Sequence, residues 1–304
     1  MLAKGNRTKE VMESCKKYGG LGRSLSGSAS ESRTFHVSVK SCGKSPAATR
    51  PTLDFCMSVE SAGEPAVTDQ CVVHRRDVPQ LTVYSWSRHG HMHSAWPGDG
   101  KEVPVDACEI KLRIVAFPGG AVREIWLDKE ARTHPHPSYE AVLFYQIDGR
   151  RVQMCNERSH EVNPGDACLE PTGVQHSTFQ LIAGMFVEFA LPAPVLPNAE
   201  ATWITAAQAR SGSDAARGCT VKIFDLPGYA LLETSLARGA AVPMHSEAFG
   251  QMFYVVKGRM LANLAGAQAE VETGACMRGV AGRDFGFTAL EESVFIQTAL
   301  PAGA

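Results

Sequence analysis

The sequence reads T-H-P-H-P-S-Y-E over residues 133–140 and G-D-A-C-L-E-P-T-G-V-Q-H over residues 165–176. On an extended strand, side chains alternate between two faces, so His134 and His136 point the same way. The chain bends at the prolines that follow, and a later strand can pair alongside. Three imidazoles and one carboxylate that converge in this way form a mixed nitrogen and oxygen site for one divalent metal ion; alternatively, the His-Pro-His segment and the later histidine are surface residues without a common role. The predicted ligands are His134, His136, Glu140 and His176.

Short apolar runs surround these two segments and are separated by Gly, Pro and Asp. They are rich in β-branched and aromatic residues and too short for globular helices, so they predict a β-sandwich or barrel. A helix is expected only at Thr205–Arg210, after a proline-rich joint at residues 192–197 that we interpret as a domain boundary. The predicted strands are Lys111–Phe117, Glu124–Leu127, Ala141–Ile147, Phe186–Leu191, Ala230–Ser235, Met252–Val256 and Ser293–Leu300.

An internal repeat divides the chain into two copies of one β-unit. The glycines at 149, 165 and 173 recur at 258, 274 and 282, a constant offset of 109 residues. Upstream, an offset of 111 pairs His134 with His245, which places a two-residue insertion between Glu140 and Gly149. Two such units predict two small barrels in tandem.

The spacing of these residues resembles the cupin superfamily. The first cupin motif is Gly, five residues, His-x-His, three or four residues, Glu, six residues, Gly. His134, His136 and Glu140 match it, although Asp128 replaces the first Gly and eight residues precede Gly149. The second motif is Gly, five residues, Pro-x-Gly, two residues, His, three residues, Asn. It is matched by Gly165, Pro171, Gly173 and His176, with Gln180 in place of Asn.

The resemblance covers residues 110–300 in two copies, so it implies a bicupin with jelly-roll barrels. It also implies one metal ion per chain at the four ligands named above. Fe(II) is the favoured ion, and Mn, Zn, Ni and Co fit the same donors. Near the ligands, Glu140, Gln180 and Tyr139 are the candidate catalytic residues, and Arg132 and Tyr145 are further candidates for the pocket wall.

The second copy keeps the glycines of the repeat but loses the ligands. In this alignment Glu247 takes the position of His136, Gln251 that of Glu140, and Phe285 that of His176. A phenyl ring at the fourth ligand position leaves an ion with too few donors. We therefore expect the second barrel to be free of metal and to have a structural role.

Three further histidines, His89, His91 and His93, alternate in R-H-G-H-M-H. On a strand their rings would share one face and bind a second ion or cover the mouth of the first barrel. In a solvated loop leading to the turn at residues 96–98 they would have no such role, and the sequence leaves both interpretations open.

Charge is unevenly distributed along the chain. The first fifty residues hold ten Lys or Arg and three acidic residues, whereas the whole chain has a net charge of −2. A basic, serine-rich stretch with no apolar periodicity predicts a disordered extension, either a transit peptide or a leader ahead of a start at Met57. We expect residues 1–66 as this extension, 67–195 as the metal-binding barrel and 196–304 as the degenerate barrel.

Composition excludes several classes of protein. No apolar run reaches the roughly 18 residues that span a bilayer, and no helix-turn-helix pattern or basic excess favours nucleic acid. The nine cysteines are odd in number and include no Cys-x-x-Cys pair, so they predict free thiols in a reducing compartment. A cytoplasmic protein with a small-molecule substrate is expected, as a monomer or a homodimer.

Three functions are compatible with such a site. The first is a mononuclear Fe(II) dioxygenase acting on a small aromatic compound, diketone or acid, because three His and one Glu leave positions for substrate and O₂. The second is a Lewis-acid isomerase, lyase or hydrolase that uses Mn, Zn or Ni. The third is a non-catalytic module that binds a small molecule. The sequence favours the first without excluding the others.

Overall fold

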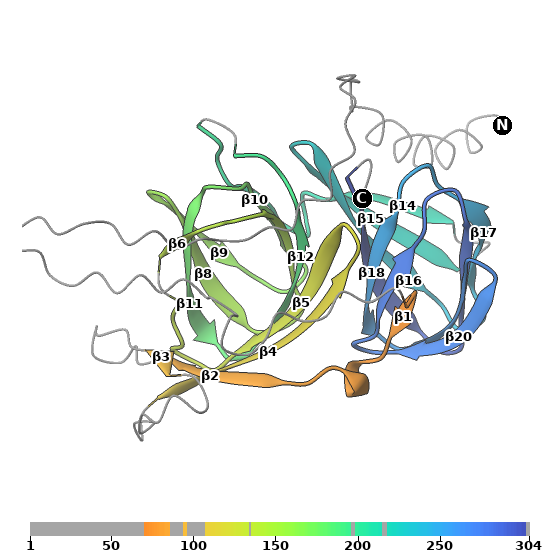
Figure 1. The fold of residues 1–304 in the computed structure, drawn as a ribbon, viewed down its shortest axis with the longest axis horizontal. Helices are drawn as coiled ribbons and strands as arrows, with labels where there is room; N and C mark the ends of the chain where they lie inside the picture. Colours follow the sequence, from red (N-terminus) through yellow and green to blue (C-terminus); the bar gives the residue numbers. More distant parts are fainter. Residues whose placement is uncertain are drawn as a thin grey trace, which may run out of the picture.

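The computed structural model describes residues 70–85, 94–95, 107–133, 135–195, 198–214 and 218–301. These residues form two β-barrels that lie side by side (Figure 1). Each barrel combines a larger and a smaller antiparallel sheet, and the predicted all-β class with two tandem jelly-roll barrels is confirmed. The basic extension over residues 1–66 and the His89-His91-His93 cluster lie outside the described residues.

The first barrel is built mainly from the first copy of the repeat. Its larger sheet contains β2 (Leu81–Ser85), β3 (Ser94–Ala95), β4 (Cys108–Phe117), β5 (Gly120–Leu127), β7 (Ala141–Gln146), β10 (Ala167–Glu170), β12 (Gly184–Leu191) and β13 (Thr202–Ile204). The strand order is β13-β10-β7-β12-β5-β4-β2-β3. The smaller sheet contains β6 (His136–Pro137), β8 (Arg150–Cys155), β9 (Arg158–Val162) and β11 (Gln175–Ile182), in the order β6-β11-β8-β9.

The second barrel repeats this arrangement. Its larger sheet contains β1 (Val72–Val73), β14 (Arg210–Asp214), β15 (Cys219–Leu226), β16 (Tyr229–Leu236), β18 (Gln251–Lys257), β21 (Cys276–Gly279) and β23 (Ser293–Ala299), in the order β1-β21-β18-β23-β16-β15-β14. The smaller sheet contains β17 (Ala241–Ser246), β19 (Arg259–Leu264), β20 (Ala267–Glu272) and β22 (Asp284–Ala289), in the order β17-β22-β19-β20. A single turn of 3-10 helix, η2 (Arg75–Asp77), follows β1.

The predicted strands are all present, and their burial explains their sequences. β4 alternates between buried and partly exposed positions along most of its length, which fits a strand with one face on the core. β7 is buried at all six positions. One face of β7 lines the first barrel with Phe144, and the other packs Leu143 and Tyr145 against the second barrel. A strand covered on both sides needs the near-continuous apolar run A-V-L-F-Y.

The structure corrects two predictions. Residues 206–208 form a turn rather than the helix expected at Thr205–Arg210, because Arg210 already pairs with Ile223 as the start of β14. The second correction concerns the repeat, which keeps its offset of 109 residues upstream instead of changing to 111. β16 begins 109 residues after β5 begins, and β15 ends 109 residues after β4 ends.

The register of the smaller sheets fixes the correspondence of the histidines. His136 faces His176 across β6 and β11, and His245 faces Phe285 across β17 and β22. His245 is therefore the counterpart of His136, not of His134. The two-residue insertion after Glu140 does not exist, and Val142 occupies the strand position that Gln251 has in the second barrel.

The glycines of the repeat mark tight turns at equivalent places. Gly149 and Gly258 both have φ in the left-handed region, at 72° and 88°. A Cβ on Gly149 would lie 2.6 Å from the carbonyl oxygen of Ala183, so only glycine fits this close approach. The other four glycines, Gly165, Gly173, Gly274 and Gly282, also have positive φ.

The two barrels exchange edge strands. β1 precedes the first barrel in sequence but pairs with β21 of the second, through Val72 and Met277. β13 follows the proline-rich joint but pairs with β10 of the first barrel, through Trp203 and Cys168. One edge of each larger sheet, at β21 and at β10, is thus covered by a strand from the other half of the chain.

A shared apolar core joins the barrels between these exchanged strands. It includes Phe117, Leu143 and Phe189 from the first barrel and Phe224 and Leu231 from the second. Each barrel also encloses a separate core of its own. The barrels therefore form a single packed unit.

Two equivalent tyrosine–glutamate hydrogen bonds cross this interface. Tyr254 donates its hydroxyl to Glu124 at 2.8 Å, and Tyr145, its counterpart at the offset of 109, donates to Glu233 at 2.6 Å. Burial raises the pKa of both tyrosines, which keeps the hydroxyls protonated as donors. Both carboxylates are buried. Tyr145 consequently faces the second barrel and not the first barrel's interior.

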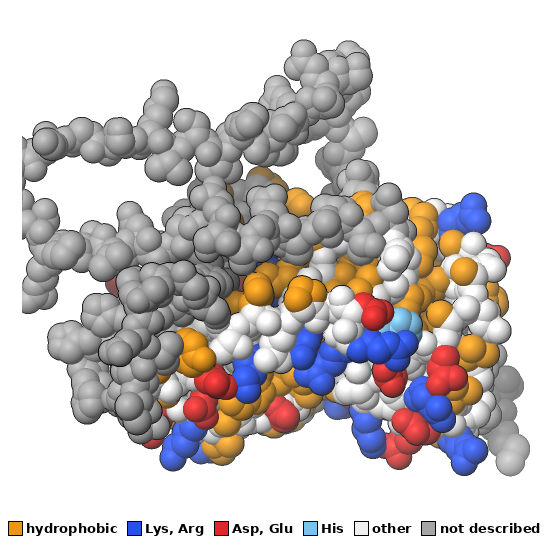
Figure 2. All heavy atoms as spheres, turned by 60° about the horizontal axis from the view of Figure 1, so that its bottom comes forward, with side chains coloured by type: hydrophobic (Ala, Val, Ile, Leu, Met, Phe, Trp, Pro, Cys, Tyr) orange, Lys and Arg blue, Asp and Glu red, His pale blue; other side chains and the backbone are white. Residues whose placement is uncertain are grey.

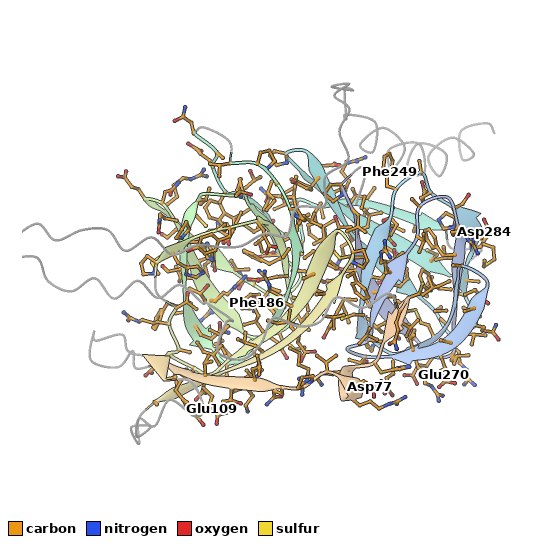
Figure 3. All side chains as sticks on the ribbon, viewed as in Figure 1. Asp77, Glu109, Phe186, Phe249, Glu270 and Asp284 are labelled. Atoms are coloured by element: carbon orange, nitrogen blue, oxygen red, sulfur yellow. The ribbon has the colours of Figure 1, made fainter. Side chains whose placement is uncertain are left out.

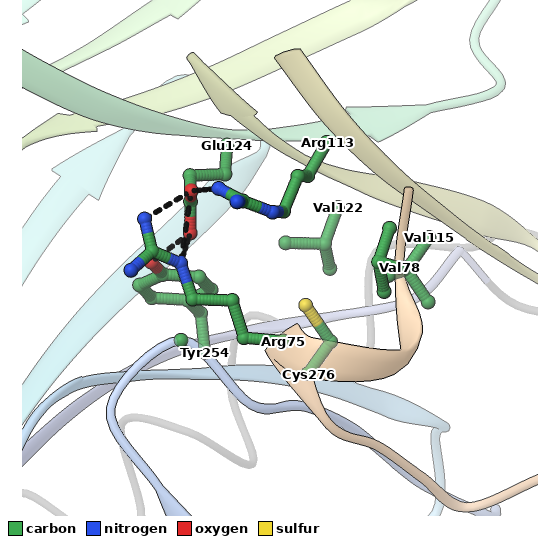
Figure 4. Close-up of a pocket in the computed structure, with 9 residues that line it drawn as sticks. Arg75, Val78, Arg113, Val115, Val122, Glu124, Tyr254 and Cys276 are labelled. Atoms are coloured by element: carbon green, nitrogen blue, oxygen red, sulfur yellow. Dashed lines mark hydrogen bonds and ion pairs between the residues drawn. The ribbon is translucent and has the colours of Figure 1, made fainter. Parts of the chain in front are cut away.

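Glu124 has additional partners that anchor the N-terminal segment (Figure 4). Arg75 of η2 donates to it through Nε and Nη2, and Arg113 of β4 donates through Nη1 at 2.7 Å. A cavity of about 10 Å³ lies beside this group, which is room for about one water molecule. Through Arg75, segment 72–78 binds Glu124 of the first barrel, and this buried carboxylate also accepts a hydrogen bond from Tyr254 of the second barrel.

We predict that a chain beginning at Leu81, which lacks β1 and η2, is less stable by about 2 kcal/mol, or about 4–8 °C in Tm. It loses the β1 ladder and the hydrogen bonds from Arg75 to Glu124. A chain beginning at Met57 keeps both and should melt within about 2 °C of the full chain. Thermal unfolding followed by circular dichroism measures this. Equal Tm values for the two truncations would contradict it.

Charged side chains of both signs are interspersed on the described part of the face in Figure 2. Exposed ion pairs such as Arg76–Glu272 and Arg259–Glu270 occur on this fold. Within the described residues, none of the six cysteines forms a disulfide bond with another. None of the described segments contains a helix long and apolar enough to cross a membrane.

Candidate metal centre in the first barrel

Two of the four predicted ligands lie side by side in the first barrel. His136 of β6 and His176 of β11 are directly paired in the antiparallel ladder, which sends both side chains to the same face. Their ring centroids are 4.2 Å apart, with the rings inclined at 59°. His134 is outside the described residues.

Neighbouring side chains fix the orientation of His176. Its Nδ1 lies 3.0 Å from the hydroxyl oxygen of Ser138 and 3.6 Å from Oε2 of Glu170. Burial lowers the pKa of His176, which favours the neutral imidazole. In metal sites, a histidine whose one nitrogen is held by such an outer partner uses the other as the ligand. For His176 that nitrogen is Nε2.

The side chain of Glu140 forms an ion pair with an arginine of the same barrel. It precedes β7 in the bend after the His-Pro-His segment, and its Oε2 is 2.5 Å from Nη2 of Arg123 on β5. Arg123 also approaches Glu188 of β12, with 3.7 Å between Nη1 and Oε2. The carboxylate that the sequence assigns to the metal is thus already paired with a cation.

The polar groups inside the first barrel are ordered by depth. The side chains of Arg123 and Glu140 are the most exposed, at 29% and 33%, and mark the mouth. Glu188 and His176 follow at 15% and 14%, and Glu170 is 1% exposed. Solvent exposure of these side chains therefore falls from Glu140 and Arg123 to Glu170.

A chain of hydrogen bonds holds Glu170, the most buried of these groups. Oε1 of Glu170 accepts from Nε2 of Gln153 at 2.5 Å and from Sγ of Cys155 at 3.4 Å. The Gln153 amide oxygen in turn accepts from the hydroxyl of Thr178. Burial raises the pKa of Glu170 and also that of Glu188. These carboxylates are proton acceptors of higher basicity than surface ones.

Arg151 of β8 is also buried. Its guanidinium stacks between two phenyl rings, 4.1 Å from the centroid of Phe144 and 3.5 Å from that of Phe186. Figure 3 shows Phe186 within the first barrel. Burial lowers the pKa of Arg151 to about 10, opposed by the charges of Glu170 and Glu188. The group still carries its positive charge at neutral pH.

Three of these buried charged residues, Arg151, Glu170 and Glu188, were not predicted from the sequence. The sequence pattern that could have indicated Arg151 is weak. In R-V-Q-M-C, the polar residues Arg151 and Gln153 are two positions apart, which places them on one face of a strand. Alternation alone does not say whether that face is solvent or barrel interior.

The candidate catalytic residues differ in their surroundings. Gln180 is completely buried, and its amide nitrogen donates to the carbonyl of Ile182 at 2.6 Å. Tyr139 is exposed beside Glu140. Arg132 stacks on the ring of Phe179, with 4.4 Å to its centroid.

The equivalent position in the second barrel is apolar. The ring of Phe285 packs 4.3 Å from that of His245, where the first barrel has two imidazoles. Phe253, Phe287 and Phe295 fill the space behind it. Nδ1 of His245 lies 2.8 Å from the carbonyl oxygen of Pro243. Nε2 of His245 lies 3.9 Å from Oε1 of Glu247, so this site offers one imidazole and one nearby carboxylate.

The donors of the first barrel fit a divalent metal in part. Two adjacent imidazoles, one of them oriented by outer partners, suit a borderline ion such as Fe(II), Mn(II) or Zn(II). Within the described residues, no group of three His, Cys, Asp or Glu side chains is arranged to hold an ion. A complete site therefore needs a donor from outside those residues, for which His134 is placed by sequence, or a change of partner by Glu140.

The sequence matches no protein-family model and no curated protein. The fold, in contrast, is similar to solved structures. AerE from Microcystis aeruginosa is 9% identical, with 66% of this chain and 96% of that chain covered and a TM-score of 0.56. An oxalate decarboxylase–formate complex from Lactobacillus farciminis is 13% identical, with coverages of 78% and 88% and a TM-score of 0.58.

Oxalate decarboxylase from Bacillus subtilis, a protein with Mn(II) centres, is 14% identical, with 79% of both chains covered and a TM-score of 0.57. These proteins have the cupin fold, and the decarboxylases carry it twice in one chain. At such identities the similarity concerns the fold, and it agrees with the tandem barrels described above. The chain is therefore a cupin-fold protein, with two cupin barrels in tandem.

Proposed function

We propose that this chain is a metal-dependent enzyme that acts on a small organic molecule inside the first barrel. The supporting observation is the pair of adjacent histidines, His136 and His176, at a level of the barrel that solvent still reaches. We assign His134 as the third imidazole and Glu140 as the fourth ligand. The second barrel, with Phe285 opposite His245, serves as the structural partner.

A divalent ion at this place would supply Lewis acidity and, in the case of iron, a centre for reaction with O₂. The protein's own groups set the surroundings. Arg123 holds the carboxylate of Glu140 in an ion pair, and Ser138 holds the His176 ring in position. Glu188, with its raised pKa, lies next to the entrance and is suited to accept a proton.

Dioxygenation with Fe(II) is the reaction that we favour, because three histidines and one carboxylate leave positions for both substrate and O₂. A Lewis-acid reaction without O₂ is the alternative. The Mn(II) centres of the Bacillus subtilis oxalate decarboxylase, whose fold is similar, make Mn(II) the first ion to consider in that case.

Metal analysis combined with an oxygen-uptake screen tests the proposal. Protein purified without air is analysed for metals and then assayed against small aromatic compounds, diketones and acids. About one iron per chain with substrate-dependent O₂ uptake supports the dioxygenase. Manganese or zinc with turnover under argon supports the Lewis-acid enzyme. A filled site without turnover points to a binding protein, and a chain that binds no divalent ion contradicts the proposal.

The role of Glu140 is tested by its replacement with Gln. If Glu140 is a ligand, Glu140→Gln removes the one anionic donor and weakens metal binding, by less than His134→Ala does, while activity changes strongly. If Glu140 remains paired with Arg123 and acts as an outer-sphere base, metal content stays intact and turnover is lost. Elemental analysis and steady-state rates separate these results. Unchanged metal content together with unchanged activity would exclude Glu140 from the site.

A further inference from the structure

The larger sheet of the second barrel ends in an edge strand, β14. Within the described residues its one neighbour in the sheet is β15, with which it forms five consecutive antiparallel pairs (Figure 1). Every second residue of an edge strand turns its backbone N–H and C=O groups away from the sheet, where another strand can bind them. β14 has none of the prolines, lysines or bulges that protect such edges. It therefore presents a regular edge.

The first barrel continues by one strand on the same side of its sheet. β2 pairs with β4 as β14 pairs with β15, and β4 and β15 are equivalent strands of the repeat. On its outer side β2 carries a further antiparallel strand, β3, through the pairs Tyr84–Ala95 and Ser85–Ser94. Within the part of the chain that the structure describes, β14 has no such outer neighbour. The repeat thus indicates a strand position beside β14 that the first barrel fills and the second does not.

The sequence of β14, R-S-G-S-D, is complementary to itself when it is read in the opposite direction. In an antiparallel pair of two copies centred on Gly212, Arg210 of each copy faces Asp214 of the other, and Ser211 faces Ser213. Residues directly opposite each other share one face of a sheet, so both charged pairs attract. A shift of one residue would break both pairs. Gly212 lies on the twofold axis, where it has no side chain to separate the strands.

The side chain of Arg210 is already held in place within one chain. Asp225 of β15 accepts hydrogen bonds from its Nε and, at 3.0 Å, from its Nη2. A guanidinium that one carboxylate has fixed loses less conformational freedom when it meets a second carboxylate. Arg210, Ser211 and Ser213 are exposed to solvent. The edge is thus both ordered and accessible.

From these observations we infer that β14 is the surface through which two copies of this chain associate. Their larger sheets join edge to edge about a twofold axis at Gly212. The contact involves five residues of each chain, much less than a stable dimer interface requires. The dimer is therefore weak, with a Kd on the order of 100 µM.

Sedimentation equilibrium of the full-length protein between about 5 and 500 µM tests the association. We expect the average mass to rise with concentration from that of one chain, 32.7 kDa, toward twice that value. Hydrogen exchange at the amides of residues 210–214 should slow over the same range. A mass of one chain at every concentration overturns the inference, and it would mean that β14 stays single or is covered by another segment of its own chain.

Reversal of charge assigns the contact to β14. Asp214→Arg places two arginines opposite each other, and Arg210→Asp places two aspartates opposite each other, so each variant should associate at least about tenfold more weakly than the native chain. A mixture of the two variants restores both pairs of opposite charge. The mixture should therefore associate at least about tenfold more tightly than either variant alone. Folded variants that keep the native affinity, or a mixture that stays monomeric, contradict the inference.

Glu270→Arg is the matched control. Glu270 lies on β20, the edge strand of the smaller sheet, and forms an exposed ion pair with Arg259. The substitution changes the net charge as Asp214→Arg does and should leave the association unchanged. An equal loss of association would assign the effect to net charge and not to β14. If a variant fails to fold, the concentration dependence of hydrogen exchange at residues 210–214 in the native chain still decides whether this edge is covered.

Discussion

Replacing Glu124 with Gln is expected to lower the free energy of unfolding by about 3 kcal/mol. The buried carboxylate accepts hydrogen bonds from Arg75, Arg113 and Tyr254. An amide at this place keeps one acceptor oxygen and turns an NH₂ group toward the two guanidinium groups. Arg113, which is the more buried of the two, loses its counter-ion. A buried charge left without its partner accounts for most of the loss.

Glu272→Gln is the control for this substitution. Glu272 also pairs with an arginine of η2, Arg76, but both side chains of that pair are largely exposed. Because exposed ion pairs contribute little, Glu272→Gln should change the free energy of unfolding by less than about 1 kcal/mol. Denaturant unfolding monitored by tryptophan fluorescence measures both variants. If both variants lose the same free energy of unfolding, the buried ion pairs of Glu124 contribute no more than the exposed pair Arg76–Glu272.

Replacing His176 with Ala is expected to reduce metal content from about one ion per chain to about a tenth of that or less. The substitution removes one imidazole of the adjacent pair and leaves Glu170 and Ser138 without the ring that they orient. The remaining histidines cannot complete the coordination of a divalent ion. Elemental analysis after dialysis against a weak chelator gives the stoichiometry.

His245→Ala is the matched control in the second barrel. His245 corresponds to His136 by strand register, but its ring packs on Phe285 and its Nδ1 contacts a backbone carbonyl. Metal content should therefore be unchanged in this variant. Loss of metal on changing His245, or a stoichiometry near two in the native chain, would assign metal binding to the second barrel as well.

The strands and the turns between them could be predicted from the sequence because their determinants are local. Val115 and Phe117 on β4 or Leu143 on β7 are apolar residues in short runs, and Gly149 ends such a run where only glycine fits. Period-two alternation and the spacing of a known family predicted that His136 and His176 converge, and the two residues face each other across β6 and β11; their role as metal ligands stays a prediction.

The predictions that failed depend on pairing between distant segments. The offset of 111 came from matching His245 to the first histidine of His-Pro-His, whereas the ladder matches it to the second. Propensity at Thr205–Arg210 was outweighed by the pairing of Arg210 with Ile223. The ion pair of Glu140 with Arg123 was not foreseen, because Arg123 lies on another strand and no local pattern connects the two; the assignment of Glu140 as a ligand stays a prediction.

The exchange of edge strands has a consequence for the order of events during protein synthesis. Val72 leaves the ribosome 205 residues before its partner Met277. At roughly 5–20 residues per second, β1 waits roughly 10–40 s for the strand that it completes. β10, by contrast, waits for only about 35 residues until Trp203 arrives opposite Cys168. The first barrel can thus close its edge while the chain is still growing, whereas the earliest strand of the fold is among the last to find its place.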